Sequence, residues 1–196
     1  MSGWLGAERD AAAADRILDA AGRVFASSGT ESGMGDIARA AGCSRATVYR
    51  YFEDRHALRS AFVHRAAREI ARDVAAGIGS FEDPTERLVE AVTRSIGAVR
   101  ADPVLLAWFS APNALVANEM AAESEVIAAI GAAFLDARRD DLSTGRVDDL
   151  LLRARWTVRV IVSLLAAPEA ELSDERALLQ RFLAPVVLDR STAAAP

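Results

Sequence analysis

The sequence has few of the residues that disulfide-bonded, metal-binding and membrane-spanning proteins require. Cys43 is its single cysteine, which excludes an internal disulfide and any multi-cysteine metal site. His56 and His64 are its two histidines, and without further ligands they predict no metal site. No stretch reaches the ~18 consecutive apolar residues of a transmembrane helix. The N-terminus lacks a basic start followed by an apolar block, so we expect no secretory signal. We therefore expect a soluble, cytoplasmic protein without a metal or cofactor.

Motifs of the common enzyme classes are also missing. The sequence has no nucleophile elbow, no phosphate-binding loop and no pair of histidines flanking a glutamate on one helix. Acidic residues scattered along amphipathic helices are typical of solvated faces. We therefore expect no enzymatic activity and no catalytic residue.

Lysine is absent, so all 23 basic residues are Arg. The net charge of −5 conceals an asymmetry. Residues 1–72 contain 11 Arg and 9 acidic residues, a net charge of +2, whereas residues 73–196 contain 12 Arg and 19 acidic residues, a net charge of −7. A mildly basic N-terminal unit joined to an acidic body is suited to a protein whose one end meets phosphates.

The composition favours helices. Aromatic residues make up 6% of the chain and hydrophobic residues 52%, with alanine supplying much of the apolar count. Alanine is the best helix former, and few stretches alternate apolar and polar residues as strands do. Apolar periodicity and capping residues predict an all-α fold of about nine helices. They cover about residues 10–28, 34–41, 45–51, 53–79, 83–101, 102–112, 113–140, 147–166 and 173–189.

Residues 34–52 have the layout of a helix-turn-helix. Two short helices are joined by a tight turn at Gly42, which permits the positive φ that such a turn needs. Ser44 follows as the N-cap of the second helix. The residues expected to pack both helices against the preceding one are Ile37, Ala38, Val48 and Phe52.

The outer face of the second helix suits DNA. Its first turns carry polar and small side chains, where recognition helices meet base edges. Arginine makes bidentate hydrogen bonds to guanine O6 and N7, while Ala46 and the Thr47 methyl group suit a thymine methyl. Hydroxyl groups at Ser44, Tyr49 and Tyr51 suit phosphates. The positions expected to point outward are Arg45, Ala46, Thr47, Tyr49 and Arg50.

This stretch resembles the DNA-binding domain of the TetR family of transcriptional regulators. The matching run covers about residues 13–60 without a gap, with Ile17-Leu18-Asp19-Ala20-Ala21, Asp36-Ile37-Ala38-Arg39-Ala40-Ala41-Gly42, Ser44-Arg45-Ala46-Thr47-Val48-Tyr49-Arg50-Tyr51-Phe52 and Asp54-Arg55-His56-Ala57-Leu58. The resemblance implies base or phosphate contacts by Arg45, Ala46, Thr47, Tyr49 and Arg50, and phosphate contacts by Ser44, Tyr51 and Arg55.

Two positions depart from the family pattern. The family usually has Lys where this chain has Arg55, and arginine differs from lysine in geometry and hydration. Gly35 stands where the family often has a polar or basic residue that reaches DNA, so that contact is expected to be missing. Cys43 is expected to be a small turn residue, with a redox sensor as the alternative. An all-α protein-interaction module without DNA binding is the alternative to the whole functional interpretation.

The C-terminal part predicts a homodimer. Residues 147–166 are apolar nearly all round, which indicates burial on more than one side. With residues 173–189 of each subunit they would form a four-helix bundle about a two-fold axis. Three polar members, Arg155, Arg159 and Ser163, either pair with acidic groups or carbonyl oxygens across that bundle or lie at its edge. The candidate interface residues are Arg155, Arg159, Ser163, Leu164, Leu179, Phe182, Leu183 and Val186.

A pocket for a small ligand is expected in the same region. A short, proline-bounded helix combines Trp108 and Phe109 with Asn113, which gives aromatic walls and one hydrogen-bonding group. Ordinary core packing is the alternative. The ligand is expected to be apolar or amphipathic. The candidate pocket residues are Phe62, Ile96, Val99, Trp108, Phe109, Asn113, Met120, Phe134 and Trp156.

These expectations define the domain organisation. Residues 1–10 are expected to be a disordered arm, 11–58 the DNA-binding domain, 59–190 the ligand-binding and dimerisation domain, and 191–196 a disordered tail. The resemblance implies a regulator of transcription that binds a palindromic operator in double-stranded DNA and is released by a ligand. Repression is the family tendency, and activation stays open.

Overall fold

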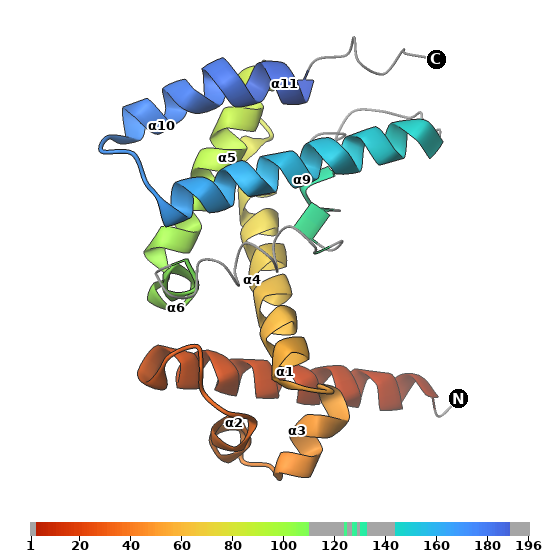
Figure 1. Cartoon of the computed structure of the whole chain (residues 1–196). Coiled ribbons are helices and arrows are strands. Elements are labelled where there is room, and N and C mark those ends of the chain that lie inside the picture. Colours follow the sequence, from red (N-terminus) through yellow and green to blue (C-terminus); the bar gives the residue numbers. More distant parts are fainter. Residues whose placement is uncertain (1–2, 110–123, 125–126, 129, 133–143, 189–196) are drawn as a thin grey trace. The chain divides into compact units, whose positions relative to one another are not determined.

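A computed structural model of the chain describes residues 3–109, 124, 127–128, 130–132 and 144–188, with the backbone alone for residues 3–8 and 144–146. The described residues form helices joined by turns (Figure 1), which confirms the predicted all-α fold. Most of the helix predicted at 113–140 lies outside the described residues. No described helix is long and apolar enough to span a membrane. The chain divides into two compact units, residues 1–65 and 66–196.

The first unit contains a long helix followed by two short ones. These are α1 (Gly3–Ser28), α2 (Met34–Ala41), α3 (Arg45–Tyr51) and the first part of α4 (Arg55–Ile78). The bounds of α2 and α3 are those predicted. The helix start expected near Asp10 is too late, because α1 already begins at Gly3 and includes most of the stretch expected to be a disordered arm.

The core of the first unit comes from the predicted apolar positions. The ring of Phe25 meets that of Phe62 edge to face, with their centroids 5.4 Å apart. Beyond Phe62, Arg65 forms an ion pair with Asp19 at 2.8 Å. Because both contacts fall after Leu58, the first unit extends to Arg65 rather than to the expected boundary at Leu58. The predicted inner-face residues are all buried, namely Ile37, Ala38, Val48 and Phe52.

The second unit is built around α5 (Pro84–Ala101), which packs against α9 (Thr144–Ala166) and α11 (Ala184–Leu188). Along the chain, α6 (Pro103–Ala107) follows α5, while α10 (Leu172–Leu178) and a π-helical stretch, η1 (Leu179–Leu183), come between α9 and α11. Their shared apolar core contains Leu88, Val89, Val92, Ile96, Leu164, Leu165, Leu179, Leu183, Ala184 and Val187.

Side-chain caps set the starts of α5 and α6. The carboxylate of Asp83 accepts hydrogen bonds from the amides of Thr85 and Glu86, at 2.6 and 3.2 Å. The carboxylate of Asp102 caps α6 in the same way. Each cap is followed directly by proline at the first helical position, where the missing amide hydrogen is not needed. Both helix starts were therefore predictable from the sequence.

A buried ion pair ties α10 to α5. Glu175 is 5% exposed, and its two carboxylate oxygens accept hydrogen bonds from the guanidinium of Arg100 at 2.6 and 2.8 Å. Arg100 also donates to the carbonyl oxygen of Leu164 at 3.0 Å, which brings in the end of α9. The hydrogen bonds from Arg100 lower the pKa of Glu175, although burial opposes them. Three helices of the second unit thus meet at one guanidinium.

A second carboxylate joins the same two helices nearby. Glu90 on α5 accepts a hydrogen bond from Arg94 at 2.7 Å and another from Arg176 of α10 at 2.8 Å. These two hydrogen bonds lower the pKa of Glu90. Both carboxylates are therefore stabilised in their charged form by folding.

Replacing Glu175 by Gln should destabilise the second unit by about 1–3 kcal/mol at pH 7, because a buried hydrogen-bonded charge is lost and Arg100 keeps an imperfect partner. The lowered pKa sets the pH dependence. The stabilisation is present above the ordinary Glu pKa of about 4.3 and disappears as pH falls through the lower folded-state value. Urea unfolding at pH 7 and below pH 4 should show that the difference in free energy of unfolding between wild type and variant becomes smaller in acid. Glu171→Gln, an exposed neighbour, is the control, and an equal pH response of wild type and E175Q would contradict the assignment.

Candidate nucleic-acid interface

The turn between α2 and α3 is fixed by backbone hydrogen bonds. Gly42 has φ 67°, the left-handed conformation that glycine adopts without strain. Its amide donates to the carbonyl of Arg39 at 3.2 Å, and the amide of Cys43 donates to the carbonyl of Ala38 at 3.0 Å. This is the Schellman pattern, which satisfies the last carbonyl groups of a helix. Cys43 is half-buried and supplies one of these amides, as expected of a turn residue, while the alternative of a redox sensor is untested.

Ser44 caps α3 as predicted. Its hydroxyl oxygen accepts a hydrogen bond from the amide of Thr47 at 3.0 Å, and the two hydroxyl groups lie 2.8 Å apart. Every residue between α2 and α3 is held by a backbone or cap hydrogen bond. Gly42 ends α2, the amide of Cys43 donates to the carbonyl of Ala38, and Ser44 caps α3. The direction in which α3 leaves the turn is therefore set locally.

The two faces of α3 have opposite character. Val48 is fully buried, so the helix is anchored through that side. Thr47 is half-buried at the edge of the outer face. The remaining predicted contact residues of the first two turns are exposed, namely Ser44, Arg45, Ala46, Tyr49 and Arg50. The structure therefore brings the predicted set together on one accessible surface.

Both arginines of this surface lie against a tyrosine ring. The guanidinium carbon of Arg45 is 5.4 Å from the ring centroid of Tyr49, and its Nη2 donates to the Tyr49 hydroxyl at 3.2 Å. The corresponding distances between Arg50 and Tyr51 are 4.8 and 2.8 Å. Cation–π stacking and a hydrogen bond to the same partner restrict each guanidinium. The hydrogen bond to Tyr49 raises the pKa of Arg45, which is charged at every physiological pH.

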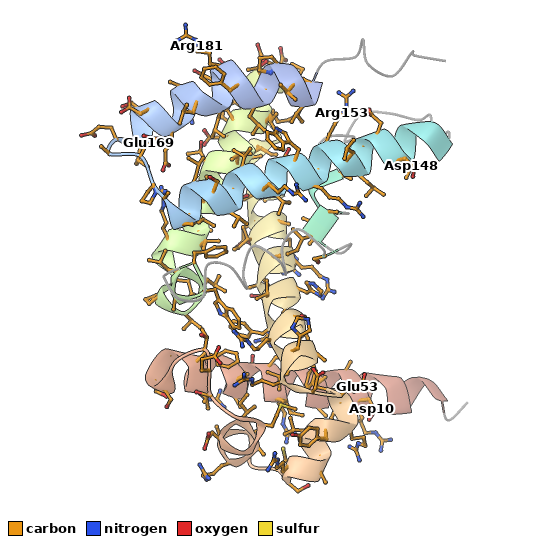
Figure 2. The ribbon with its side chains drawn as sticks, in the orientation of Figure 1. Asp10, Glu53, Asp148, Arg153, Glu169 and Arg181 are labelled. Carbon is orange, nitrogen blue, oxygen red and sulfur yellow. The ribbon has the colours of Figure 1, made fainter. Side chains whose placement is uncertain are left out.

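Tyr51 has a partner that the sequence did not reveal. Its hydroxyl donates to the carboxylate of Asp10 on α1 at 3.0 Å. Figure 2 labels Asp10 on α1 and Glu53 just beyond the end of α3. Because Asp10 and Tyr51 are 41 positions apart, no local pattern could have indicated the contact. Tyr51, predicted to face phosphate, is half-buried and uses its hydroxyl hydrogen within the protein.

Arg55, predicted to contact phosphate, is also engaged within the chain. It donates to the carbonyl oxygen of Glu31 at 2.9 Å and approaches the carboxylate of Glu31 at 3.2 Å. The same carboxylate pairs with the buried Arg59 at 3.0 Å. Arg55 remains exposed, so a phosphate that approached it would compete with Glu31 for one guanidinium.

The predicted pocket residues occupy several environments. Phe62 belongs to the core of the first unit, whereas Ile96 belongs to the core of the second, and Val99 and Phe109 pack against that second core. Trp108 is 2% exposed. Trp156 lies on the surface of α9 with 48% of its area exposed. Asn113, Met120 and Phe134 lie outside the described residues. The pocket itself stays a prediction.

Among the described residues, no group of three or more His, Cys, Asp or Glu side chains is placed to hold a metal ion. The surface of α3 instead presents guanidinium, hydroxyl and methyl groups. These are donors and apolar contacts of the kinds that base edges accept in the major groove.

Comparison with known proteins agrees with this geometry. Residues 17–62 match the family described as bacterial regulatory proteins, tetR family. An uncharacterized HTH-type transcriptional regulator of Mycobacterium tuberculosis H37Rv is 47% identical over 192 residues, covering 97% of this chain and 93% of that protein. The HTH-type transcriptional repressor LfrR of Mycolicibacterium smegmatis is 36% identical over 112 residues, 56% of each chain.

A solved structure shares the fold. The TetR family repressor AlkX from Dietzia sp. strain DQ12-45-1b superposes with a TM-score of 0.64 at 20% identity, over 89% of this chain and 96% of AlkX. The helix-turn-helix geometry, the family match and the full-length relative lead to one conclusion. The chain belongs to the TetR family of bacterial regulatory proteins and is a helix-turn-helix regulator of transcription.

Proposed function

We propose that this regulator is a repressor that binds a palindromic operator as a homodimer, in the cytoplasm, with α3 of each subunit in the major groove. The observation that carries the proposal is the exposed face of α3, on which both arginines are held against tyrosine rings. A dimer places two such helices about one DNA turn apart, which accounts for a palindromic site. LfrR and AlkX are named as repressors, which favours repression over activation.

Arg45 and Arg50 are the proposed base contacts. Each offers N–H groups beyond the one used by its tyrosine, and a guanidinium forms two parallel hydrogen bonds with guanine O6 and N7. Ala46 and the Thr47 methyl group lie on the same surface and suit a thymine methyl. Ser44 is exposed at the N-terminus of α3, where a phosphate would meet both its hydroxyl group and the free amides of the helix.

Arg45→Ala and Arg50→Ala should each weaken operator binding by about 1–3 kcal/mol, roughly 5- to 150-fold in Kd. The loss follows from the bidentate base contact, so specificity at one operator position should relax. Arg72→Ala removes an exposed arginine of the second unit that lies outside the proposed dimer surface, and it is the matched control. Fluorescence anisotropy with an operator duplex measures the effect. Unchanged affinity in both α3 variants would favour the protein-interaction module without DNA binding.

Arg55 is the proposed phosphate contact on α4, and Glu31 is its competitor. Arg55→Ala should weaken specific and nonspecific duplexes alike and reduce the slope of log Kobs against log salt by about 0.9. Glu31→Gln should strengthen the binding of both duplexes, because it removes the carboxylate that pairs with Arg55 and leaves only the hydrogen bond to the Glu31 carbonyl. Titrations at several salt concentrations measure both slopes. A sequence-dependent loss in Arg55→Ala would contradict a phosphate role.

The proposed dimer surface lies on α9, α10, η1 and α11. Large apolar side chains are exposed there, which is unusual for a protein that acts alone. On α9, the predicted polar members Arg155, Arg159 and Ser163 are exposed as well. Three predicted members are instead buried in the core of their own subunit and do not lie on the surface, namely Leu164, Leu179 and Leu183. The exposed large apolar residues of these helices are Leu152 (66%), Trp156 (48%), Leu172 (66%), Leu178 (36%), Phe182 (62%) and Val186 (60%).

Trp156→Glu or Phe182→Glu should convert the dimer to a monomer, because a carboxylate would be buried without a partner in the apolar surface. Operator binding should fall with it although α3 is unchanged, since one half-site supplies only part of the contacts. Leu106→Glu, at an exposed apolar position on α6, is the control. Light scattering after gel filtration gives the mass. A dimeric Trp156→Glu, Phe182→Glu double variant would overturn this surface.

We also propose that an apolar or amphipathic small molecule binds in the second unit and releases the operator. Ile96, Val99 and Phe109 support this place, since they lie together in that unit. α4 supplies Phe62 to the core of the first unit and Val74 and Ile78 to the second, so it connects the two covalently as one helix. Release requires different affinities of the ligand for the two conformers. Release by highly polar metabolites alone would argue against this ligand class.

A further inference from the structure

We propose that Asp10 is a positioning residue for Arg50, so that the N-terminal part of α1 shapes the operator-binding face of α3 through Tyr51. The inference rests on the proposed binding of DNA through Arg50. It adds a residue that lies before the segment matched by the family, which begins at residue 17.

Three groups form a continuous chain of hydrogen bonds. The carboxylate of Asp10 accepts from the Tyr51 hydroxyl at 3.0 Å, and that hydroxyl accepts from Nη2 of Arg50 at 2.8 Å. The guanidinium of Arg50 also stacks on the ring of Tyr51, 4.8 Å from its centroid. Tyr51 is therefore held at one side and holds Arg50 at the other.

The hydrogen-bonding capacity of tyrosine gives this chain a direction. A phenol has one hydrogen to donate, and here that hydrogen goes to Asp10. The lone pairs of the hydroxyl oxygen are then available to Arg50. Without the carboxylate the hydroxyl could rotate and donate to water or phosphate, and Arg50 would lose a fixed acceptor. Asp10 thus determines the orientation of a group that it reaches only through Tyr51.

Arg50 keeps most of its donors for DNA. A guanidinium has five N–H groups, and the hydrogen bond to Tyr51 uses one of them. A long side chain that is ordered before binding loses less conformational entropy when it meets a base. The expected benefit is therefore in specific binding, where the geometry of Arg50 matters, and not in general attraction to phosphates.

Electrostatics alone predicts the opposite sign. Asp10 is an exposed carboxylate close to the DNA-binding face, and removing a negative charge there strengthens attraction to phosphates. A positioning role predicts instead that its loss weakens the operator complex. Asp15 separates the two effects. It is exposed on the same helix, and its carbonyl oxygen accepts a hydrogen bond from Arg65, whereas its side chain forms no hydrogen bond or ion pair within the part of the chain that the structure describes.

The test compares full-length Asp10→Ala, Asp10→Asn, Tyr51→Phe and Asp15→Ala. Each is titrated with an operator duplex and a scrambled duplex of equal length at the same salt concentration. Asp10→Ala and Tyr51→Phe should lose roughly 2- to 10-fold of operator affinity, the cost of ordering one long side chain. Both should bind the scrambled duplex at least as well as wild type. Asp10→Asn should restore the operator preference, because its amide oxygen can accept from Tyr51. Asp15→Ala should keep the wild-type ratio of operator affinity to scrambled-duplex affinity.

A background of Arg50→Ala completes the experiment. Adding Asp10→Ala there should cause no further loss, since the positioned group is gone. The inference is overturned if Asp10→Ala keeps the wild-type ratio, if Asp10→Asn behaves like Asp10→Ala, or if the loss persists without Arg50. Thermal unfolding of Asp10→Ala itself checks for a folding defect, and Tyr51→Phe, which keeps the ring, removes the same hydrogen bond from the other partner. Failure of wild type to prefer any palindrome would instead refute the proposed function.

Discussion

The left-handed turn at Gly42 is the constraint on which the DNA-binding face depends. Gly42 and Cys43 satisfy the last carbonyl groups of α2, and Ser44 caps α3 at once. Because this leaves no flexible connection, the burial of Ile37 on α2 and Val48 on α3 fixes the rotation of both helices together. A side chain at Gly42 would strain a φ of 67° and disturb that rotation. Which side of α3 is accessible therefore follows from the backbone of the turn that precedes it.

The arginines of this region do not form a bare positive patch. Arg45 and Arg50 have tyrosine partners, and Arg55 has Glu31. This matters in a chain without lysine, whose N-terminal third has only a small positive charge. With little long-range attraction available, we expect the affinity for a particular operator to depend more on arginines that are already ordered. Stacking on tyrosine supplies order without neutralising the guanidinium, whereas Glu31 does neutralise its partner in part.

Most of the fold could be predicted from local sequence patterns. The bounds of α2 and α3 and the caps at Ser44, Asp83 and Asp102 were predictable because the groups involved are two to four residues apart. The start of α1 was not, since its first residues have no apolar period, and extending an existing helix needs only adequate propensity. Contacts between distant positions were also beyond reach. The pair Arg100–Glu175 spans 75 residues, and the burial of Glu175 is not visible in the polar run Ser173-Asp174-Glu175-Arg176.

The π-helical stretch explains which of the predicted interface positions between Leu178 and Val187 are exposed and which are buried. Positions four apart drift around an α-helix, because a turn contains 3.6 residues. In η1 the wider π turn offsets that drift. Leu179, Leu183 and Val187 therefore stay on the buried side through two steps of four, while Leu178, Phe182 and Val186 stay exposed. Periodicity from the sequence placed all of these leucines and valines on one apolar helix. Only the backbone separates the row that builds the subunit from the row that is free to meet a second one.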